Sequence, residues 1–265
     1  MTKLVLFDID GTLLNSEGRV PASAAAAVER LRENHILTGL CTGRCASETR
    51  QFLRDFPALN MDVQIHTNGA IVKYKGEYLY DKPLPREALA EVIGDFRRRG
   101  LPYWVSGREY WYYGFRDLSP IRDWMVSDDE SRDDYYDPDY YLHNDVYIAE
   151  VLLDASRAGD IPLPEGLELV PGMLVGGRPG PMLDLWAKDI DKATGVQKCL
   201  DRLGILPEEV MAFGDSFNDI PIIKLAGIGV AMGNGSQEVR RVADYVTKEI
   251  DDDGIYSALA HFGLI

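Results

Sequence analysis

Short apolar runs alternate with helical patterns in the first and last thirds of this 265-residue chain, and this alternation restricts the fold more than any other feature. Leu4–Phe7 is a continuous apolar run, which is typical of a strand buried on both faces. Further strand patterns lie at His35–Cys41 and Val63–His66, and helical patterns lie at Pro21–Glu33 and Ala46–Phe56. Because strands that alternate with helices pair in parallel, the sequence predicts an α/β fold with a Rossmann-like parallel sheet and helices on both faces.

A middle segment of the chain departs from this alternation. After Pro83-Leu84-Pro85 come one helical pattern and several strand patterns, at Arg86–Arg99, Tyr103–Val105, Tyr110–Phe115, Tyr147–Leu153, Leu167–Val175 and Met182–Trp186. Strands joined by turns, with few helices between them, are typical of a mainly antiparallel α+β module. The sequence therefore predicts a core of residues 1–82 and 188–265, interrupted by an inserted α+β domain of residues 83–187.

The alternation of strand and helix returns after residue 188. The expected elements are the helices Lys192–Leu203, Ile220–Leu225, Ser236–Ala243 and Ile255–Phe262 and the strands Val210–Phe213, Ile228–Met232 and Asp244–Thr247. Gly204 and Gly263 follow helical patterns, where a glycine commonly ends a helix. These elements are expected to complete the parallel sheet of the core.

The charge of the chain excludes one class of partner. It has 28 basic and 43 acidic residues, which give a formal net charge of −15. A surface this negative repels polyphosphate backbones, so we expect no nucleic-acid partner. Residues 117–145 are strongly acidic and lie within an aromatic-rich stretch at 103–147, so we expect an ordered surface there rather than a disordered tail. An anionic ligand would require a local cation.

Cysteine usage and the lack of long apolar runs indicate the compartment. Cys41, Cys45 and Cys199 form no CxxC pair, so the sequence predicts neither a disulfide framework nor a zinc site and fits a reducing compartment. The apolar run at residues 4–7 is too short for a signal peptide, and none reaches the roughly 18 residues of a membrane span. We expect a cytoplasmic protein with no membrane partner and no obligate protein partner.

Acidic residues follow two of the predicted strands. Asp8 and Asp10 come after the first strand, and Asp215 and Asp219 come after the strand Val210–Phe213. Parallel strands of one sheet end at the same edge, so these four carboxylates are expected to meet there. Four unpaired carboxylates close together are costly, and a hard cation such as Mg²⁺ resolves the repulsion and bridges to phosphate oxygens. The alternative for the first pair alone is two solvated turn aspartates.

Two further positions suit an anion. Thr42-Gly43-Arg44 ends the second strand and opens a helix, where a hydroxyl and free backbone N–H groups favour a negative ligand, although threonine is also a common helix cap. Lys192 begins the helix that reopens the core, ahead of the strand that leads to Asp215. A lone lysine is usually a solvated surface charge. Lys192 is a candidate site residue because it lies after the inserted segment and before the strand that leads to Asp215.

With these residues the chain resembles the haloacid dehalogenase-like (HAD) hydrolases, and within them the Cof-type phosphatases with a large C2-type cap between the second and third motifs. The resemblance covers the whole chain. Four motifs carry it, namely Asp8-x-Asp10-Gly11-Thr12, Thr42-Gly43-Arg44, Lys192 and Gly214-Asp215-x-x-Asn218-Asp219, together with Thr67-Asn68-Gly69-Ala70, Val230-Ala231-Met232-Gly233-Asn234 and Asp253-Gly254-Ile255. Ala193 departs from the pattern, since the subfamily more often has glycine there.

The resemblance implies a role for each motif. Asp8 would be the nucleophile that forms an aspartyl-phosphate, and Asp10 would be the general acid and base. Mg²⁺ would be held by Asp8, the Asp10 backbone carbonyl and Asp215. The phosphate-binding residues would be Gly11, Thr12, Thr42, Gly43 and Asn218, with Lys192 as a further catalytic residue and Asp219 orienting Lys192 or a metal-bound water.

The resemblance implies a Mg²⁺-dependent phosphatase of small phosphorylated metabolites, with sugar phosphates as the first substrate class and nucleotide, flavin and pyridoxal phosphates left open. A phosphomutase with the same core would return the phosphoryl group to a sugar, and the motifs do not separate the two activities. A non-catalytic binding module that kept the fold is a third hypothesis, which the intact motifs disfavour.

The inserted domain would then act as a cap that sets substrate specificity. Its aromatic side chains could stack on a sugar or base, although packing inside the domain is the alternative for most of them. Arg178, on the predicted hairpin tip Gly176–Pro181, could also face the substrate, although a surface loop is the alternative there.

Overall fold

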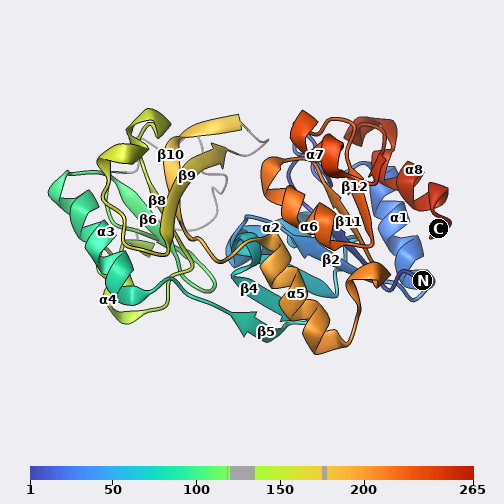
Figure 1. Ribbon diagram of the computed structural model, residues 1–265, viewed down its shortest axis with the longest axis horizontal. Helices are drawn as coiled ribbons and strands as arrows, with labels where there is room; N and C mark the ends of the chain where they lie inside the picture. Colours follow the sequence, from blue (N-terminus) through green and yellow to red (C-terminus); the bar gives the residue numbers. More distant parts are fainter. Residues whose placement is uncertain (118, 120–134, 175–177) are drawn as a thin grey trace. The chain divides into compact units, whose positions relative to one another are not determined.

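The computed structural model describes residues 1–117, 119, 135–174 and 178–265, which form two compact units (Figure 1). The first unit comprises Met1–Arg44, Glu48–Asp81 and Ile190–Ile265, and the second comprises Cys45–Ser47 and Lys82–Asp189. Each unit has a β-sheet of its own. In the described part of the chain, no helix has both the length and the apolar character that crossing a bilayer requires.

The first unit contains an eight-stranded sheet in the order β13-β12-β11-β1-β2-β3-β4-β5. The strands are β1 (Leu4–Phe7), β2 (Leu37–Cys41), β3 (Val63–His66), β4 (Ile71–Tyr74), β5 (Glu77–Asp81), β11 (Val210–Gly214), β12 (Ile228–Ala231) and β13 (Tyr245–Val246). The pairs from β13 through to β3 are parallel, whereas β4 and β5 add an antiparallel edge. The predicted α/β fold with a mainly parallel sheet is therefore confirmed.

The antiparallel edge is absent from the predictions above. β4 and β5 are joined by Lys75 and Gly76, which both have positive φ, 48° and 85°. A two-residue loop with glycine second is a common hairpin turn, because its backbone twist matches that of the flanking strands. The Lys75-Gly76 pair between the short runs Ile71–Tyr74 and Glu77–Asp81 was the available signal for this hairpin.

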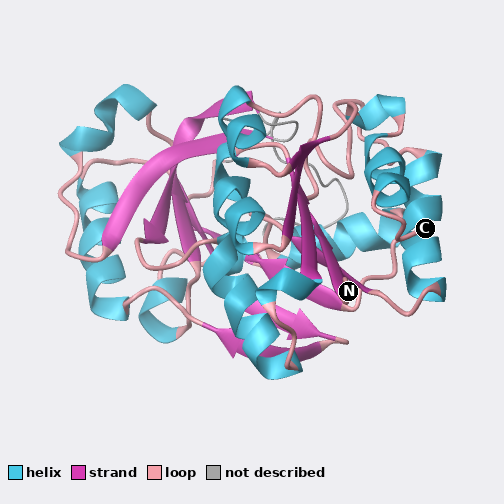
Figure 2. Cartoon of the chain, turned by 45° about the vertical axis from the view of Figure 1, so that its right-hand side comes forward, coloured by secondary structure: helices cyan, strands magenta, loops and turns pink. Residues whose placement is uncertain are grey.

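Helices cover both faces of the core sheet (Figure 2). They are α1 (Ala22–Glu33), α2 (Ala46–Asp55), α5 (Lys192–Leu203), α6 (Ile220–Leu225), α7 (Gln237–Val242) and α8 (Gly254–His261), with the short 3₁₀ helices η1 (Thr67–Gly69), η5 (Pro207–Glu209), η6 (Phe217–Asp219) and η7 (Ile250–Asp252). On one face α1, α2 and α8 pack on an apolar cluster that contains Phe7 and Phe213, whose rings stack 5.1 Å apart. On the other face α5 and α6 pack on a second cluster that includes Leu6 and Ala212. Successive residues of each buried strand thus serve opposite cores, which explains the continuous apolar runs.

The second unit is a five-stranded sheet in the order β7-β6-β8-β10-β9, and every neighbouring pair is antiparallel. Its elements are β6 (Tyr103–Ser106), β7 (Trp111–Tyr113), β8 (Ile148–Val151), β9 (Leu167–Leu174), β10 (Arg178–Ala187), α3 (Arg86–Arg98), α4 (Tyr140–His143) and the 3₁₀ helix η4 (Ala155–Asp160). The predicted antiparallel α+β module is confirmed. Arg178 is the first residue of β10, opposite Leu174, and its side chain lies outside the described part of the structure.

Many aromatic residues of the second unit form its interior. The buried ones are Phe96, Tyr103, Trp104, Tyr113, Tyr141 and Tyr147. Tyr112 and Tyr140 are less buried and stack on each other, with ring centroids 3.7 Å apart. These contacts favour packing over ligand binding as the role of most aromatics in this unit. Residues 118 and 120–134 of the acidic stretch lie outside the described residues.

The first turns of α5 approach η1 so closely that only glycines fit between them. A Cβ atom on Gly195 would lie 2.6 Å from the Cα and 2.8 Å from the carbonyl oxygen of Gly69. By contrast, the closest atom to a Cβ on Gly94, within α3, is a guanidinium nitrogen of Arg98 at 3.4 Å. A side chain at position 195 would therefore collide with fixed backbone, whereas one at position 94 would meet only the end of a flexible side chain.

We expect Gly195→Ala to destabilise the protein by about 1–3 kcal/mol, because overpacking against fixed backbone outweighs the higher helix propensity of alanine. Gly94→Ala, the matched control, is expected to stabilise α3 by up to about 1 kcal/mol. Differential scanning calorimetry of the two variants measures both effects. Equal stabilisation by both changes would contradict the assigned contact between α5 and η1.

Candidate active site

Three parallel strands bring the predicted motifs to one edge of the core sheet. β1 lies between β11 and β2, and a motif begins at or just beyond the end of each strand, with Asp8 after β1, Asp215 after β11 and Thr42 after β2. The backbone N–H of Asp8 donates to the Phe213 carbonyl at 3.1 Å, so the β1–β11 pairing extends to the first acidic residue. The parallel register therefore determines which carboxylates meet.

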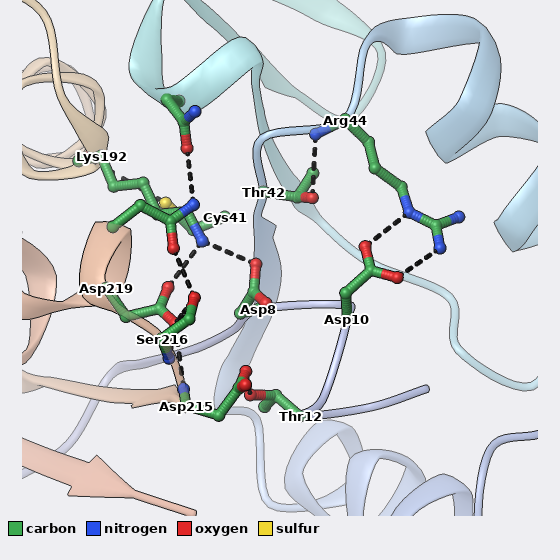
Figure 3. A network of polar contacts seen from close by, with 12 residues as sticks. Asp8, Asp10, Thr12, Cys41, Thr42, Arg44, Lys192, Asp215, Ser216 and Asp219 are labelled. Carbon is green, nitrogen blue, oxygen red and sulfur yellow. Dashed lines mark hydrogen bonds and ion pairs between the residues drawn. The ribbon is translucent and has the colours of Figure 1, made fainter. Parts of the chain in front are cut away.

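Lys192 is the first residue of α5, and its side chain is fully buried. Its ammonium group donates to Asp8 Oδ1 at 2.6 Å and to Asp219 Oδ1 at 2.5 Å (Figure 3). Burial by itself lowers the pKa of a lysine, but the two carboxylates outweigh it, so the pKa of Lys192 is raised. The site therefore contains a buried positive charge held between two carboxylates.

Three carboxylates gather around this ammonium group. One oxygen from each of Asp8, Asp215 and Asp219 lies within 4.8 Å of the others. Burial and the charges of neighbouring carboxylates raise the pKa of Asp8 well above its ordinary value, and Lys192 offsets only part of this effect. Burial and the charge of Asp219 also raise the pKa of Asp215, to about 7. Without a bound cation, the carboxyl groups of Asp8 and Asp215 hold protons more tightly than exposed ones do.

The hydrogen bonds distinguish which carboxylates suit a metal ion. Both oxygens of Asp219 are occupied, because Oδ1 accepts from Lys192 and Oδ2 accepts from the backbone N–H groups of Asp215 and Ser216 at 2.9 and 3.0 Å. Asp8 accepts from Lys192 through Oδ1, which leaves its Oδ2 for a cation among the described contacts. Carboxylate oxygens are the ligands that Mg²⁺ prefers, so Asp8 and Asp215 fit a magnesium site better than Asp219, whose two oxygens are already hydrogen-bonded.

Asp10 is held by an arginine. The Arg44 guanidinium donates through Nε and Nη2 to the two carboxylate oxygens of Asp10, at 2.8 and 2.7 Å, and the Asp10 side chain points toward it (Figure 3). Burial lowers the pKa of Arg44, but the bond to Asp10 and its charge outweigh burial and raise that pKa. A bidentate pair of this kind fixes the orientation of the carboxylate plane.

The predicted phosphate-binding residues Thr42, Gly43 and Asn218 lie around the same edge. Thr42 is almost completely buried, and its Oγ1 accepts from the backbone N–H of Arg44 at 3.1 Å. The Asn218 amide donates from Nδ2 to Asn68 Oδ1 at 3.0 Å. A Cβ on Gly43 would lie 3.2 Å from Asn68 Nδ2, so a larger residue would crowd this asparagine. Asn68 thus contacts or lies next to all three positions, since its backbone N–H also donates to the Thr42 carbonyl.

Gly11 and Thr12 serve the carboxylate of Asp215. The Thr12 hydroxyl donates to Asp215 Oδ1 at 3.0 Å, and the backbone N–H of Thr12 donates to the Ile9 carbonyl at 3.3 Å. Gly11 has a φ of 79°, and a Cβ there would lie 2.4 Å from Asp215 Oδ2. The structure therefore places both residues against the carboxylate of Asp215, a predicted metal ligand, and the Thr12 hydroxyl is hydrogen-bonded to it.

Three residues of this site had no role in the sequence predictions, although all stand in the quoted motifs: Arg44, Asn68 and Asn234. Asn234 donates from Nδ2 to the Gly11 carbonyl at 2.8 Å and accepts at Oδ1 from the Ile250 N–H at 2.9 Å. It therefore links the loop that follows β1 to the segment before α8. The available signal was position, because each residue lies in a loop that follows a parallel strand at the edge where the carboxylates gather.

Comparison with known proteins identifies the family. Residues 5–259 match the haloacid dehalogenase-like hydrolases. The chain belongs to this family. The match includes every residue of the site described above, and the resemblance carried by the sequence motifs is confirmed. Among HAD-like hydrolases, the chain has solved neighbours in the subclass IIB phosphatases.

Two curated relatives and one solved structure illustrate the relationship. The chain is 27% identical over 267 residues to the putative phosphatase YkrA of Bacillus subtilis, covering 100% of this chain and 99% of that one. It is 32% identical over 276 residues to a putative bifunctional phosphatase/peptidyl-prolyl cis-trans isomerase of Streptococcus pyogenes, covering 99% of this chain but only 54% of that longer protein. The structure of the HAD subclass IIB sugar phosphatase BT4131 aligns with a TM-score of 0.81 and 27% identity, covering 100% of both chains.

The raised pKa values predict how stability depends on pH and Mg²⁺. The folded-state pKa of Asp215, about 7, exceeds the ordinary value of 3.8, so the metal-free fold binds this proton more tightly than the unfolded chain does. Its contribution to stability is therefore present at low pH and lost as pH rises through about 7. Mg²⁺ competes with that proton, so it should stabilise the protein more at high pH.

We expect the rise in Tm on replacing EDTA by Mg²⁺ to be larger at pH 8 than at pH 6 by about 3–5 °C, since tenfold weaker proton competition corresponds to about 1.4 kcal/mol and 1 kcal/mol to about 2–4 °C. Differential scanning fluorimetry provides the measurement. The control, Asp215→Asn, should lose the Mg²⁺-dependent shift at both pH values. Equal shifts for the unchanged protein at both pH values would contradict this account.

Proposed function

We propose that this HAD-like hydrolase is a Mg²⁺-dependent phosphatase that hydrolyses small phosphate monoesters, sugar phosphates first, through an aspartyl-phosphate on Asp8. The observation that carries the proposal is the fully buried Lys192, which contacts Asp8 and Asp219 beside the carboxylate of Asp215. A positive charge held against a nucleophilic carboxylate and next to a site for a hard cation suits the transfer of a dianionic phosphoryl group. The phosphatase names of the two curated relatives support the same class of reaction.

Asp8 would attack the phosphorus atom in line with the departing ester oxygen. Its carboxylate is buried and held at Oδ1 by Lys192, so the side chain is oriented before a substrate binds. Attack forms the Asp8–phosphorus bond and breaks the bond from phosphorus to the ester oxygen. Lys192 offsets the charge that the carboxylate and the phosphoryl oxygens bring together.

When bound, Mg²⁺ would be held by the Asp8 carboxylate, the Asp10 backbone carbonyl and Asp215, and it would supply positive charge to the phosphoryl oxygens and neutralise the carboxylate cluster. The protein residues provide the rest of the binding site. Thr42, Gly43 and Asn218 would hold the remaining phosphoryl oxygens through N–H and hydroxyl donors. Thr12 would keep the Asp215 carboxylate in place through its hydroxyl.

Asp10 would protonate the leaving oxygen and then accept a proton from the water that hydrolyses the phosphoenzyme. Arg44 orients both carboxylate oxygens of Asp10. Because this pair engages both carboxylate oxygens, Asp10 would leave it before it contacts the leaving oxygen. Arg44 is thus proposed to influence the first half-reaction more than the second.

The inserted domain predicted at residues 83–187, which lies within the second unit, is proposed to act as the cap that selects the substrate, with Arg178 as a candidate contact. All four motifs lie outside this range. Sugar phosphates come first because a solved neighbour that matches the full chain is a sugar phosphatase. The use of cysteine supports a reducing, cytoplasmic location, and the negative charge disfavours nucleic acid as a partner.

A panel of phosphate esters tests the proposed activity. Phosphate release with Mg²⁺ is expected from at least one class of small monoester, without a bisphosphate activator, and it should stop in EDTA. Full turnover in EDTA would contradict the proposed dependence on Mg²⁺. Transfer of the phosphoryl group to a second position on a sugar, with no free phosphate, would identify a phosphomutase instead.

Replacement of each motif aspartate tests the mechanism. We expect Asp8→Asn to form no phosphoenzyme, since the nucleophilic carboxylate is gone. Asp10→Asn keeps the nucleophile, so with an activated aryl phosphate, whose leaving group needs little protonation, it should still be phosphorylated and then dephosphorylate slowly. Intact-protein mass spectrometry after a rapid acid quench detects the added phosphoryl group. An adduct on Asp8→Asn, or one mapped to a serine or histidine in the unchanged protein, would contradict the assignment of the nucleophile.

A further inference from the structure

We propose that Asn68 is a positioning residue of the phosphate site, which fixes the amide of Asn218 and joins the three loops that surround the phosphoryl group. The inference rests on the proposed function and extends it to a residue with no role in the sequence analysis. It starts from the backbone. Thr67, Asn68 and Gly69 have φ values of 51°, 48° and 101°, three successive residues in the left-handed region. Such a conformation costs free energy for a β-branched threonine and persists only where surrounding contacts impose it.

The surrounding contacts come from two motif segments. The backbone N–H of Thr67 donates to the Arg44 carbonyl at 3.0 Å, and that of Asn68 donates to the Thr42 carbonyl at 3.0 Å. Gly69 lies against the start of α5, where a Cβ on it would come 2.0 Å from the Asp191 carbonyl oxygen. The left-handed turn therefore binds the Thr42 loop on one side and abuts the helix that carries Lys192 on the other.

The side chain of Asn68 adds the third segment. It is buried, and its Oδ1 accepts from Asn218 Nδ2 at 3.0 Å. The other end of the Asn218 amide, Oδ1, accepts from the Ser216 hydroxyl at 2.6 Å. The Asn68 oxygen can only accept, so it favours the orientation that turns the Asn218 nitrogen toward it, while the Ser216 hydroxyl holds the other end of the amide. Asn68 therefore determines which end of Asn218 can face a ligand.

This orientation has a chemical consequence for an anion. The Asn218 nitrogen carries two N–H groups, and the bond to Asn68 uses one of them. Among the described contacts the second N–H remains for a phosphoryl oxygen. In the opposite orientation the amide oxygen would face the anion and repel it. Asn68 thus acts through Asn218, without a need to touch the substrate itself.

The test uses a variant that removes the side chain but keeps the backbone. Glycine adopts positive φ freely, so Asn68→Gly preserves the turn, and circular dichroism with thermal melting checks the fold. Binding of inorganic phosphate to the Mg²⁺-loaded protein is measured by calorimetry for the unchanged protein, Asn68→Gly, Asn218→Ala and the double variant. We expect Asn68→Gly to weaken phosphate binding about tenfold, the value of one lost hydrogen bond to a charged group, with KM for an ester rising and kcat changing less.

Coupling between the two residues decides the outcome. If Asn68 acts through Asn218, the double variant should bind phosphate no more weakly than Asn218→Ala alone. Losses that multiply, or an Asn68→Gly variant with unchanged affinity, would overturn the inference while leaving the phosphatase in place. Should the unchanged protein neither bind phosphate nor hydrolyse any ester of the panel, the proposed function and this inference would fail together.

A second variant covers the case in which Asn68→Gly does not fold. Ser216→Ala removes the donor at the other end of the same amide, on the opposite side of Asn218 from the strained turn. It should also weaken phosphate binding in the unchanged background and have no further effect beside Asn218→Ala. Full affinity in Ser216→Ala would show that the amide orientation does not govern the site.

Discussion

The rest of the structure depends on one buried ion cluster, in which the ammonium group of Lys192 lies against Asp8 and Asp219 with no exposure to solvent. Removing these charges from water is costly, and the cost is offset only when the partners are close and fully hydrogen-bonded. The cluster therefore requires α5 to begin at the correct height beside β1 and β11. A small shift of any of these elements would leave a charge buried without its partner.

Close backbone approach is what allows this cluster to form. Gly195 and Gly69 let α5 meet η1, and Gly11 lets the acidic loop reach Asp215, each where a Cβ atom would lie within 3 Å of another group. Gly214 does the same for Asp219. The site is consequently assembled from loops whose spacing is set by backbone contacts. Rigid positioning of this kind suits phosphoryl transfer, in which the protein contributes mainly geometry and charge.

Much of the fold and of the acidic site could be predicted from the sequence, because both follow from local patterns. Buried parallel strands appear as continuous apolar runs, so β1 and β3 were predicted with the bounds that the structure shows, as was α5 with Lys192 at its start. The meeting of Asp8 and Asp215 follows from strand ends sharing one edge of a sheet. The β4–β5 hairpin was missed, because its two-residue turn is a weak local signal between short strands.

The sequence by itself determined most strands and helices of the core and the identity of the residues at the sheet edge, since each of these follows from residues near one another along the chain. Only the tertiary structure decided which partner each polar group has. Asp10 pairs with Arg44, the Thr12 hydroxyl donates to Asp215, and Lys192 donates to Asp219. Hydrogen bonds are directional and act over about 3 Å, whereas these partners are far apart in sequence, so their pairing depends on the packing of the complete sheet and helices.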